Sequence, residues 1–205
     1  MATIEATTMD LLGELTGTKE QQTKVAPVNT KVWAEWLGID VVDDEVKRMV
    51  DAAARWATAV KREESPRWLS LLGTSGSGKT HIAKRLWRWC QRRDDFEGRN
   101  QYNPAFIYWP KFLDDMKTDM HLSAKYQDMN RWRYLCLDDV LAERQSDWTA
   151  EKINTLANVR VGKWTILTSN LSMVQIAQAD NRIASRMVRN NGIVADVNTE
   201  DYNLR

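Results

Sequence analysis

A short stretch of glycines, hydroxyl side chains and one lysine is the part of this sequence best suited to chemistry. Gly73, Gly78, Lys79 and Thr80 fit the spacing G-x-x-x-x-G-K-[ST] of a phosphate-binding P-loop. Its glycines let the backbone turn tightly, and the helix that follows directs N–H groups and partial positive charge at phosphates. We expect the lysine to reach the β- and γ-phosphates and the threonine to bind Mg²⁺. The predicted nucleotide-binding residues are Gly73, Thr74, Ser75, Gly76, Ser77, Gly78, Lys79, Thr80 and His81.

Two adjacent acids follow a buried apolar run further along the chain. Asp138 and Asp139 come directly after residues 134–137, a run typical of a buried strand. We expect Asp138 to hold the metal through water, and Asp139 to orient or deprotonate an attacking water. Thr80 and Asp138 are therefore the predicted metal ligands, and Asp139 is the first predicted catalytic residue.

Three polar residues beyond the acids extend this predicted site. Asn170 follows an apolar run, where its amide can touch the γ-phosphate or the lytic water; the alternative is a simple helix cap. Arg182 and Arg186 are four residues apart and share one helical face. In an oligomeric ATPase such an arginine enters the neighbouring subunit's site, and the alternative is a solvated basic face. Asn170, Arg186 and Arg182 are the remaining candidate catalytic residues.

Apolar runs separated by amphipathic stretches position these residues. The runs predict strands at 68–72, 105–109, 134–138, 164–168 and 193–197. The stretches predict helices at 79–93, 111–120, 147–160, 173–178 and 181–189. Because continuous apolar strands alternate with helices, we expect an α/β fold whose parallel sheet is covered on both faces.

The chain upstream of the P-loop divides into two segments. Residues 1–30 are polar apart from one short apolar cluster, and we expect either a flexible extension or a peptide that docks on a partner. Residues 31–64 predict a short helix that ends at Gly38 and a long helix that runs to about Glu63. Residues 65–205 then form the nucleotide-binding domain.

Composition narrows the class of protein. Charged residues make up 28% of the chain, no apolar run is long enough to cross a membrane, and the first residues lack a secretory pattern. Cys90 and Cys136 have no nearby Cys or His partner, so we expect reduced core residues in a cytoplasmic protein without membrane partners.

The net charge of +1 means that nucleic-acid binding requires a local basic patch or an oligomer. The 10 tryptophans predict core anchors, with base stacking by one or two as the alternative.

The order of four motifs resembles one family. The P-loop, LCLDDV with the two acids, ILTSNLS with Asn170, and NRIASRM with the two arginines resemble AAA+ ATPases of the DnaC/DnaI replicative-helicase-loader group and their IstB-type relatives. The resemblance covers about residues 65–205. It implies ATP as the nucleotide and an AAA+ P-loop fold of the ASCE type with strand order 5-1-4-3-2 and no large C-terminal lid. It also implies that Asp138 and Asp139 form the Walker B pair, that Asn170 is sensor 1, and that Arg186 is the arginine finger.

The resemblance implies partners as well. Members of the group act on a hexameric replicative helicase and on single-stranded DNA, and they associate with further copies of themselves through the ATP interface. The basic candidates for a DNA groove are Lys84, Arg85, Arg88, Lys152, Arg160 and Lys163. Two other functions stay open: a transposition helper of the IstB type that binds duplex DNA, and a nucleotide-dependent adaptor without catalysis. A small-molecule kinase would leave TSNL and RIASRM unexplained.

Two departures from the family pattern carry expectations. Asp139 stands where many AAA+ proteins have a glutamate, and its shorter side chain predicts slow hydrolysis. No Cys or His precedes His81, so we expect no zinc-binding N-terminal domain of the kind that some loaders carry.

Overall fold

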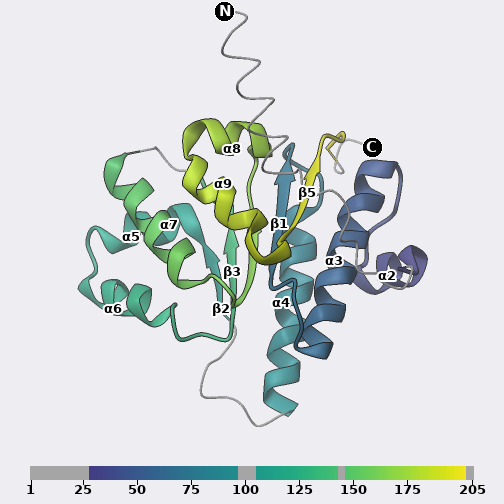
Figure 1. Cartoon of the computed structure of the whole chain (residues 1–205), viewed down its shortest axis with the longest axis horizontal. Coiled ribbons are helices and arrows are strands. Elements are labelled where there is room, and N and C mark those ends of the chain that lie inside the picture. Colours follow the sequence, from purple (N-terminus) through teal and green to yellow (C-terminus); the bar gives the residue numbers. More distant parts are fainter. Residues whose placement is uncertain (1–27, 97–104, 143–145, 202–205) are drawn as a thin grey trace, which may run out of the picture.

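A five-stranded parallel sheet forms the centre of the computed structural model, which describes residues 28–96, 105–142 and 146–201 (Figure 1). The strands are β1 (Trp68–Gly73), β2 (Ala105–Tyr108), β3 (Tyr134–Asp138), β4 (Trp164–Thr168) and β5 (Ile193–Val197). Their order is β2-β3-β4-β1-β5, and each neighbouring pair is parallel. Read from the other edge this is 5-1-4-3-2, so the predicted fold is confirmed. No large helical lid is present among the described residues, which end four residues after β5, at position 201.

Helices cover both faces of the sheet (Figure 1). One face carries α2 (Thr30–Leu37), α3 (Asp44–Arg62) and α4 (Lys79–Phe96). The other face carries α5 (Trp109–Met116), α6 (Met120–Asp128), α7 (Asp147–Val159), α8 (Met173–Ala179) and α9 (Asn181–Val188). A single 3₁₀ turn, Arg189–Asn191, leads from α9 into β5. None of these helices is long and apolar enough to span a membrane.

Two hydrophobic clusters, one on each face, explain why the strands read as continuous apolar runs. Along β1, Leu69 and Leu71 belong to the cluster under α2, α3 and α4, whereas Trp68 and Leu72 belong to the cluster under α5 to α9. Successive strand residues point to opposite faces, so burial of both faces requires apolar residues at nearly every position. Cys90 and Cys136 are buried free thiols, as predicted.

The region between β2 and β3 differs from the prediction. One helix was expected at 111–120, but the structure has α5 and α6 with a break at Lys117–Asp119. Asp119 starts the second helix, since its carboxylate accepts a hydrogen bond from the His121 amide at 2.8 Å. Helix α6 has only a weak apolar signal in the sequence, because none of its residues is fully buried and only Leu122 and Tyr126 pack, partly buried, against the core.

The segments upstream of the P-loop are only partly described. Of the extension predicted at 1–30, residues 1–27 lie outside the described residues, and Thr30 already begins α2. The two predicted helices are present as α2 and α3, and Gly38 ends the first in the left-handed region at φ 67°.

Candidate functional site

The P-loop leaves β1 at Gly73 and enters α4 at Lys79, at the carboxyl end of the strand that lies between β4 and β5. Gly73 has φ 109°, and a Cβ there would lie 1.7 Å from the Val197 carbonyl oxygen. Gly76 has φ 73°, and a Cβ there would lie 2.0 Å from the Asp201 side chain. Gly73 leaves no room for a side chain because the backbone of β5 lies against it, whereas Gly76 is favoured by its positive φ, since the Asp201 side chain can shift. The loop conformation is therefore set by β5 as well as by its own glycines.

Lys79 is a buried cation with neutral oxygens around it. Its Nζ donates to the carbonyl oxygens of Gly73 at 2.9 Å and Thr74 at 2.5 Å, and to Ser77 Oγ at 3.2 Å. Burial lowers the pKa of its ammonium to about 8, while Asp139 and Asp138 oppose that shift. Within the described residues no carboxylate pairs with it directly. The ammonium is thus positioned to gain from an anion that enters beside it.

Asp138 ends β3, and its carboxylate accepts hydrogen bonds from two hydroxyl groups. Thr80 Oγ1, at the start of α4, donates to Asp138 Oδ1 at 2.8 Å, and Thr168 Oγ1, at the end of β4, donates to the same oxygen at 2.8 Å. The first contact unites the two predicted metal ligands. Hydroxyl and carboxylate oxygens are the donors that Mg²⁺ prefers, so this set fits the predicted ion.

Asp139 lies one residue further, in the left-handed region at φ 61°. Its amide donates to Thr168 Oγ1 at 2.9 Å, and Asn170 Nδ2 donates to its Oδ1 at 2.8 Å. The Tyr108 hydroxyl donates to Oδ2 at 3.5 Å. Burial and the neighbouring Asp138 raise the pKa of the Asp139 carboxyl. A carboxylate with a raised pKa beside an amide is suited to binding a water molecule and accepting a proton from it.

These side chains face one cavity of about 480 Å³. It is lined by Gly38, Ile39, Ser75, Gly76, Ser77, Gly78, Lys79, Thr80, His81, Tyr108, Asp138, Asp139, Thr168 and Asn170. His81 is exposed, and its Nε2 lies 2.8 Å from the Leu37 carbonyl oxygen, which ties α4 to the end of α2.

Sequence reasoning missed four of the lining residues: Gly38, Ile39, Tyr108 and Thr168. Tyr108 and Thr168 end strands that flank β3, so their place at the carboxyl edge of the sheet was a usable signal. Gly38 and Ile39 reach the cavity from the segment between α2 and α3, for which the sequence offers no comparable signal.

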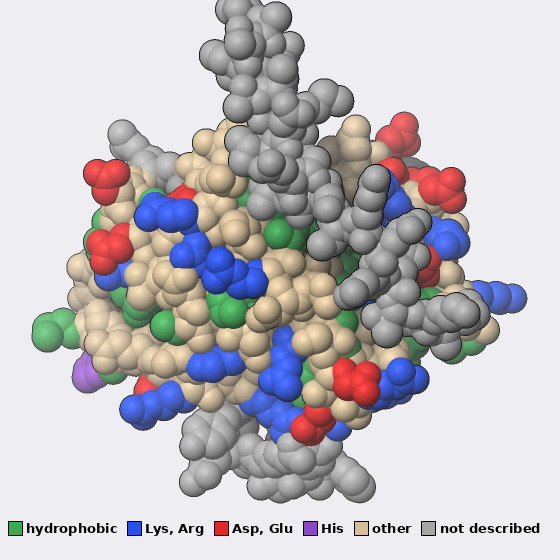
Figure 2. All heavy atoms as spheres, viewed as in Figure 1, with side chains coloured by type: hydrophobic (Ala, Val, Ile, Leu, Met, Phe, Trp, Pro, Cys, Tyr) green, Lys and Arg blue, Asp and Glu red, His purple; other side chains and the backbone are tan. Residues whose placement is uncertain are grey.

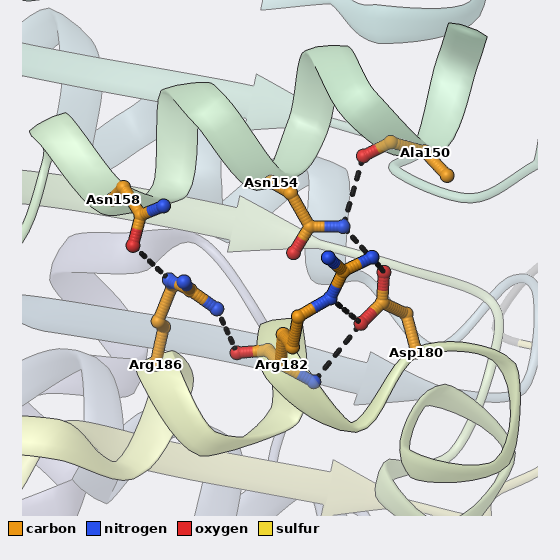
Figure 3. A network of polar contacts seen from close by, with 6 residues as sticks. All are labelled: Ala150, Asn154, Asn158, Asp180, Arg182 and Arg186. Atoms are coloured by element: carbon orange, nitrogen blue, oxygen red, sulfur yellow. Dashed lines mark hydrogen bonds and ion pairs between the residues drawn. The ribbon is translucent and has the colours of Figure 1, made fainter. Parts of the chain in front are cut away.

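The two α9 arginines do not line this cavity and are held at the surface between α7 and α9 (Figure 3). Arg182 Nε donates to Asp180 Oδ1 at 3.2 Å, and that carboxylate also accepts the side-chain amide of Asn154. Arg186 Nε donates to Asn158 Oδ1 at 2.6 Å, and its Nη1 donates to the Arg182 carbonyl oxygen at 2.6 Å. Basic side chains gather over α9 in the space-filling view (Figure 2). Burial, together with Arg189, lowers the pKa of Arg186.

One predicted DNA contact is wrong. Arg160 is fully buried and donates to the carbonyl oxygens of Met129, Trp132, Arg133 and Trp164 and to Thr165 Oγ1. It closes the loops that precede β3 and β4, so it cannot face a DNA groove.

The other basic candidates reach the surface to different degrees. The Lys163 ammonium bonds to the Asn130 carbonyl oxygen at 2.7 Å. The Lys152 ammonium lies 5.6 Å from the Tyr126 ring centroid and 5.7 Å from that of Trp148. Lys84, Arg85 and Arg88 are exposed on α4.

Comparison with known proteins agrees with this architecture at the level of the fold. No protein-family model matches the chain. The structure of DnaI is 21% identical with a TM-score of 0.61, covering 80% of this chain and 92% of that one. A DnaC helicase loader is 20% identical with a TM-score of 0.54, covering 73% and 90%. AMPPCP-bound DnaA from Aquifex aeolicus is 17% identical with a TM-score of 0.62, covering 78% and 49%.

The chain thus has the AAA+ P-loop fold of these proteins. The resemblance to the DnaC/DnaI group predicted from four short motifs is confirmed as a likeness of fold.

Proposed function

We propose that this protein is a slow ATPase of the helicase-loader type that acts in the initiation of DNA replication. The observation that carries the proposal is the convergence of Lys79, the Thr80–Asp138 pair and the Asp139–Asn170 pair on one cavity. A lysine with no directly bonded carboxylate among the described residues supplies charge for phosphates, and the paired oxygens supply a metal site. AMPPCP bound to DnaA, a protein of the same fold, supports a nucleotide as the ligand.

Each residue has a proposed role in ATP hydrolysis. The amides of residues 73–78 and the Lys79 ammonium bind the phosphates, while Thr80 and Asp138 would hold Mg²⁺. When bound, Mg²⁺ neutralises charge on the β- and γ-phosphates. Asp139 accepts the proton of the attacking water, and Asn170 orients that carboxylate. Hydrolysis is slow because the short Asp139 side chain is held by Asn170 and Tyr108.

Assembly supplies the last proposed element. Arg186, or Arg182 as the second candidate, enters the ATP site of a neighbouring copy and neutralises charge on its γ-phosphate. Both arginines lie outside the cavity of their own chain, which supports a role in trans. The proposed partners are a hexameric replicative helicase, single-stranded DNA and other copies of this chain, in the cytoplasm.

We assign a separate role to each of three consecutive segments of the chain. Residues 65–205 form the ATPase domain, and residues 31–64 form a helical lead-in whose Gly38 and Ile39 reach the nucleotide cavity. The segment predicted at residues 1–30, of which 1–27 lie outside the described residues, would supply a peptide that docks on a partner.

The first experiment is an ATPase assay with and without single-stranded DNA, duplex DNA and the replicative helicase from the same source. Stimulation by single strands together with a helicase complex supports the proposal. Stimulation by duplex alone, without helicase binding, replaces it with a transposition helper. Tight ATP binding with undetectable hydrolysis and an intact helicase complex replaces it with a non-catalytic adaptor.

The assembly step has its own test. Arg186→Ala should leave ATP binding unchanged and abolish ATP-dependent association in sedimentation velocity. Equal association of the variant and the wild-type protein would refute the assignment of Arg186.

A further inference from the structure

We infer that α2 and α4 carry a binding site for single-stranded nucleic acid. Trp36, Arg85, Arg88, Trp89 and Arg92 line a hollow of about 130 Å³ between the two helices, and no acid is among them. We call these five residues the tryptophan–arginine patch. The inference rests on the proposed function only for the premise that this protein meets single-stranded nucleic acid.

The first line of support is an exposed and rigid indole. Trp36 is 40% exposed, the most of the 10 tryptophans. Its ring packs edge to face against Trp33, with centroids 5.4 Å apart, and against Trp89, with centroids 6.4 Å apart. Such a ring offers its surface to a base without losing much conformational freedom, and stacking on aromatic rings is how proteins hold unpaired bases.

Arg85 fixes the helix that carries this indole. Its Nε donates to the Leu37 carbonyl oxygen at 3.1 Å and its Nη2 donates to the Trp36 carbonyl oxygen at 2.9 Å. These are carbonyl groups at the end of α2 that a helix leaves unpaired. The guanidinium therefore joins α2 to α4 and keeps Trp36 beside the arginines of α4.

The second line of support is charge without compensation. From Lys79 to Arg93, α4 contains six basic residues and no acid, and its acids, Asp94 and Asp95, come only in the last turn. Arg88 and Arg92 are exposed and four residues apart, and neither makes a hydrogen bond or ion pair with another described residue. The acids nearest to Trp36 in the sequence, Glu35 and Asp40, line a different hollow on α2. Two free guanidinium groups beside a stacking ring match a base and its flanking phosphates.

The tryptophan–arginine patch also provides the local concentration of positive charge that a nearly neutral chain needs in order to bind a polyanion. The net charge of the whole chain is only +1, so a polyanion has to be bound by a local patch. A duplex hides its base faces and would use the arginines but not Trp36. An acidic peptide would likewise use the charges without needing a planar aromatic surface.

The test measures binding of a fluorescently labelled oligo(dT) 20-mer to the full chain by anisotropy, over a range of salt concentrations. Arg88→Glu/Arg92→Glu should weaken binding at least about tenfold. The slope of log K against log salt concentration should become shallower by about 0.7 for each phosphate that the variant no longer neutralises. Trp36→Leu should weaken oligo(dT) binding about tenfold and leave binding of a 20-base-pair duplex unchanged. Arg55→Glu/Arg131→Glu is the charge-matched control on exposed residues outside the patch, and it should bind within about twofold of wild type.

The outcomes separate this inference from the proposed function. If wild-type protein binds oligo(dT) but the patch variants and the control lose affinity equally, the patch assignment fails and the proposed function stands. If wild-type protein binds no oligo(dT) in the presence or absence of ATP, the single-strand element of the proposed function fails too. If poly-glutamate displaces oligo(dT) equally well and Trp36→Leu has no effect, the patch is a site for an acidic protein and the inference is overturned.

Discussion

Lys79 and Arg160 are both buried cations without a carboxylate partner among the described residues, yet the structure uses them in opposite ways. Arg160 donates to four carbonyl oxygens and one hydroxyl, and burial lowers its pKa to about 9, which leaves it charged at neutral pH. Lys79 donates to three oxygens of the P-loop and lines a cavity. A buried cation marks a ligand site only where space remains beside it.

The surroundings of the two cations make the same distinction. Three acids, Asp139, Asp138 and Asp196, lie close enough to Lys79 to oppose the lowering of its pKa, whereas burial alone accounts for the lowered pKa of Arg160. Lys79 lines an open cavity in which an anionic ligand can lie beside its ammonium, and the neighbouring Thr80–Asp138 pair offers oxygens to a metal ion. Arg160 has its hydrogen-bonding capacity filled by backbone and serves to close the loops before β3 and β4.

The largest effect on folding is expected from Arg160→Leu. Removing the guanidinium leaves buried carbonyl oxygens without donors, so the free energy of unfolding should fall by about 3 kcal/mol or more. Urea denaturation measures this change. Arg131→Leu, at an exposed arginine nearby, should change stability by less than about 0.5 kcal/mol, and equal destabilisation of both variants would contradict the structural role of Arg160.

The largest effect on ligand binding is expected from Lys79→Ala. Affinity for a fluorescent ATP analogue should fall at least about a hundredfold, because the variant cannot make the charge-assisted hydrogen bonds to the phosphates. The urea midpoint should stay near that of the wild-type protein, since Lys79 lines the cavity and water can replace it at the Gly73 and Thr74 carbonyl oxygens. A variant that binds the analogue within threefold of wild type would remove Lys79 from the site.

A smaller effect, confined to turnover, is expected from Asp139→Asn. The amide keeps the shape of the side chain but cannot accept a proton, so hydrolysis should slow by about ten- to a hundredfold while nucleotide affinity stays unchanged. Single-turnover assays with radiolabelled ATP measure the two quantities separately. Wild-type turnover by the variant would show that another group activates the water.

The smallest effect is expected from Asn158→Ala. This variant tests whether Arg186, at the surface of α9, acts in association, unlike the two buried cations, which act within their own chain. Its amide oxygen accepts from Arg186, and one such hydrogen bond contributes about 1 kcal/mol. ATP-dependent association should weaken about fivefold, with a loss of stability no larger than about 1 kcal/mol. Thr155→Ala, at another exposed position of α7, is the matched control. If it weakens association more than Asn158→Ala does, the positioning role of Asn158 is refuted.

Local patterns predicted most of the fold and much of the cavity. Strands buried on both faces left continuous apolar runs, and the P-loop spacing located the phosphate loop between β1 and α4. Helix α6 was missed because it packs on the core through only two partly buried residues, Leu122 and Tyr126. Arg160 was assigned to DNA because the sequence shows that an arginine is charged but not that it is buried. Tyr108 was overlooked because its role depends on the neighbouring strand β3.

The sequence by itself determined the class of fold, the loop that receives phosphate and the acids at the end of β3, because these depend on spacing along one segment. Tertiary structure decided which cations meet solvent, which strand ends are neighbours, and where α2 meets α4 to form the tryptophan–arginine patch. Those properties depend on contacts between residues far apart in the chain, for example Leu37 and His81, whose sequence separation is 44. Burial and proximity of this kind arise only when the sheet and its helices pack together.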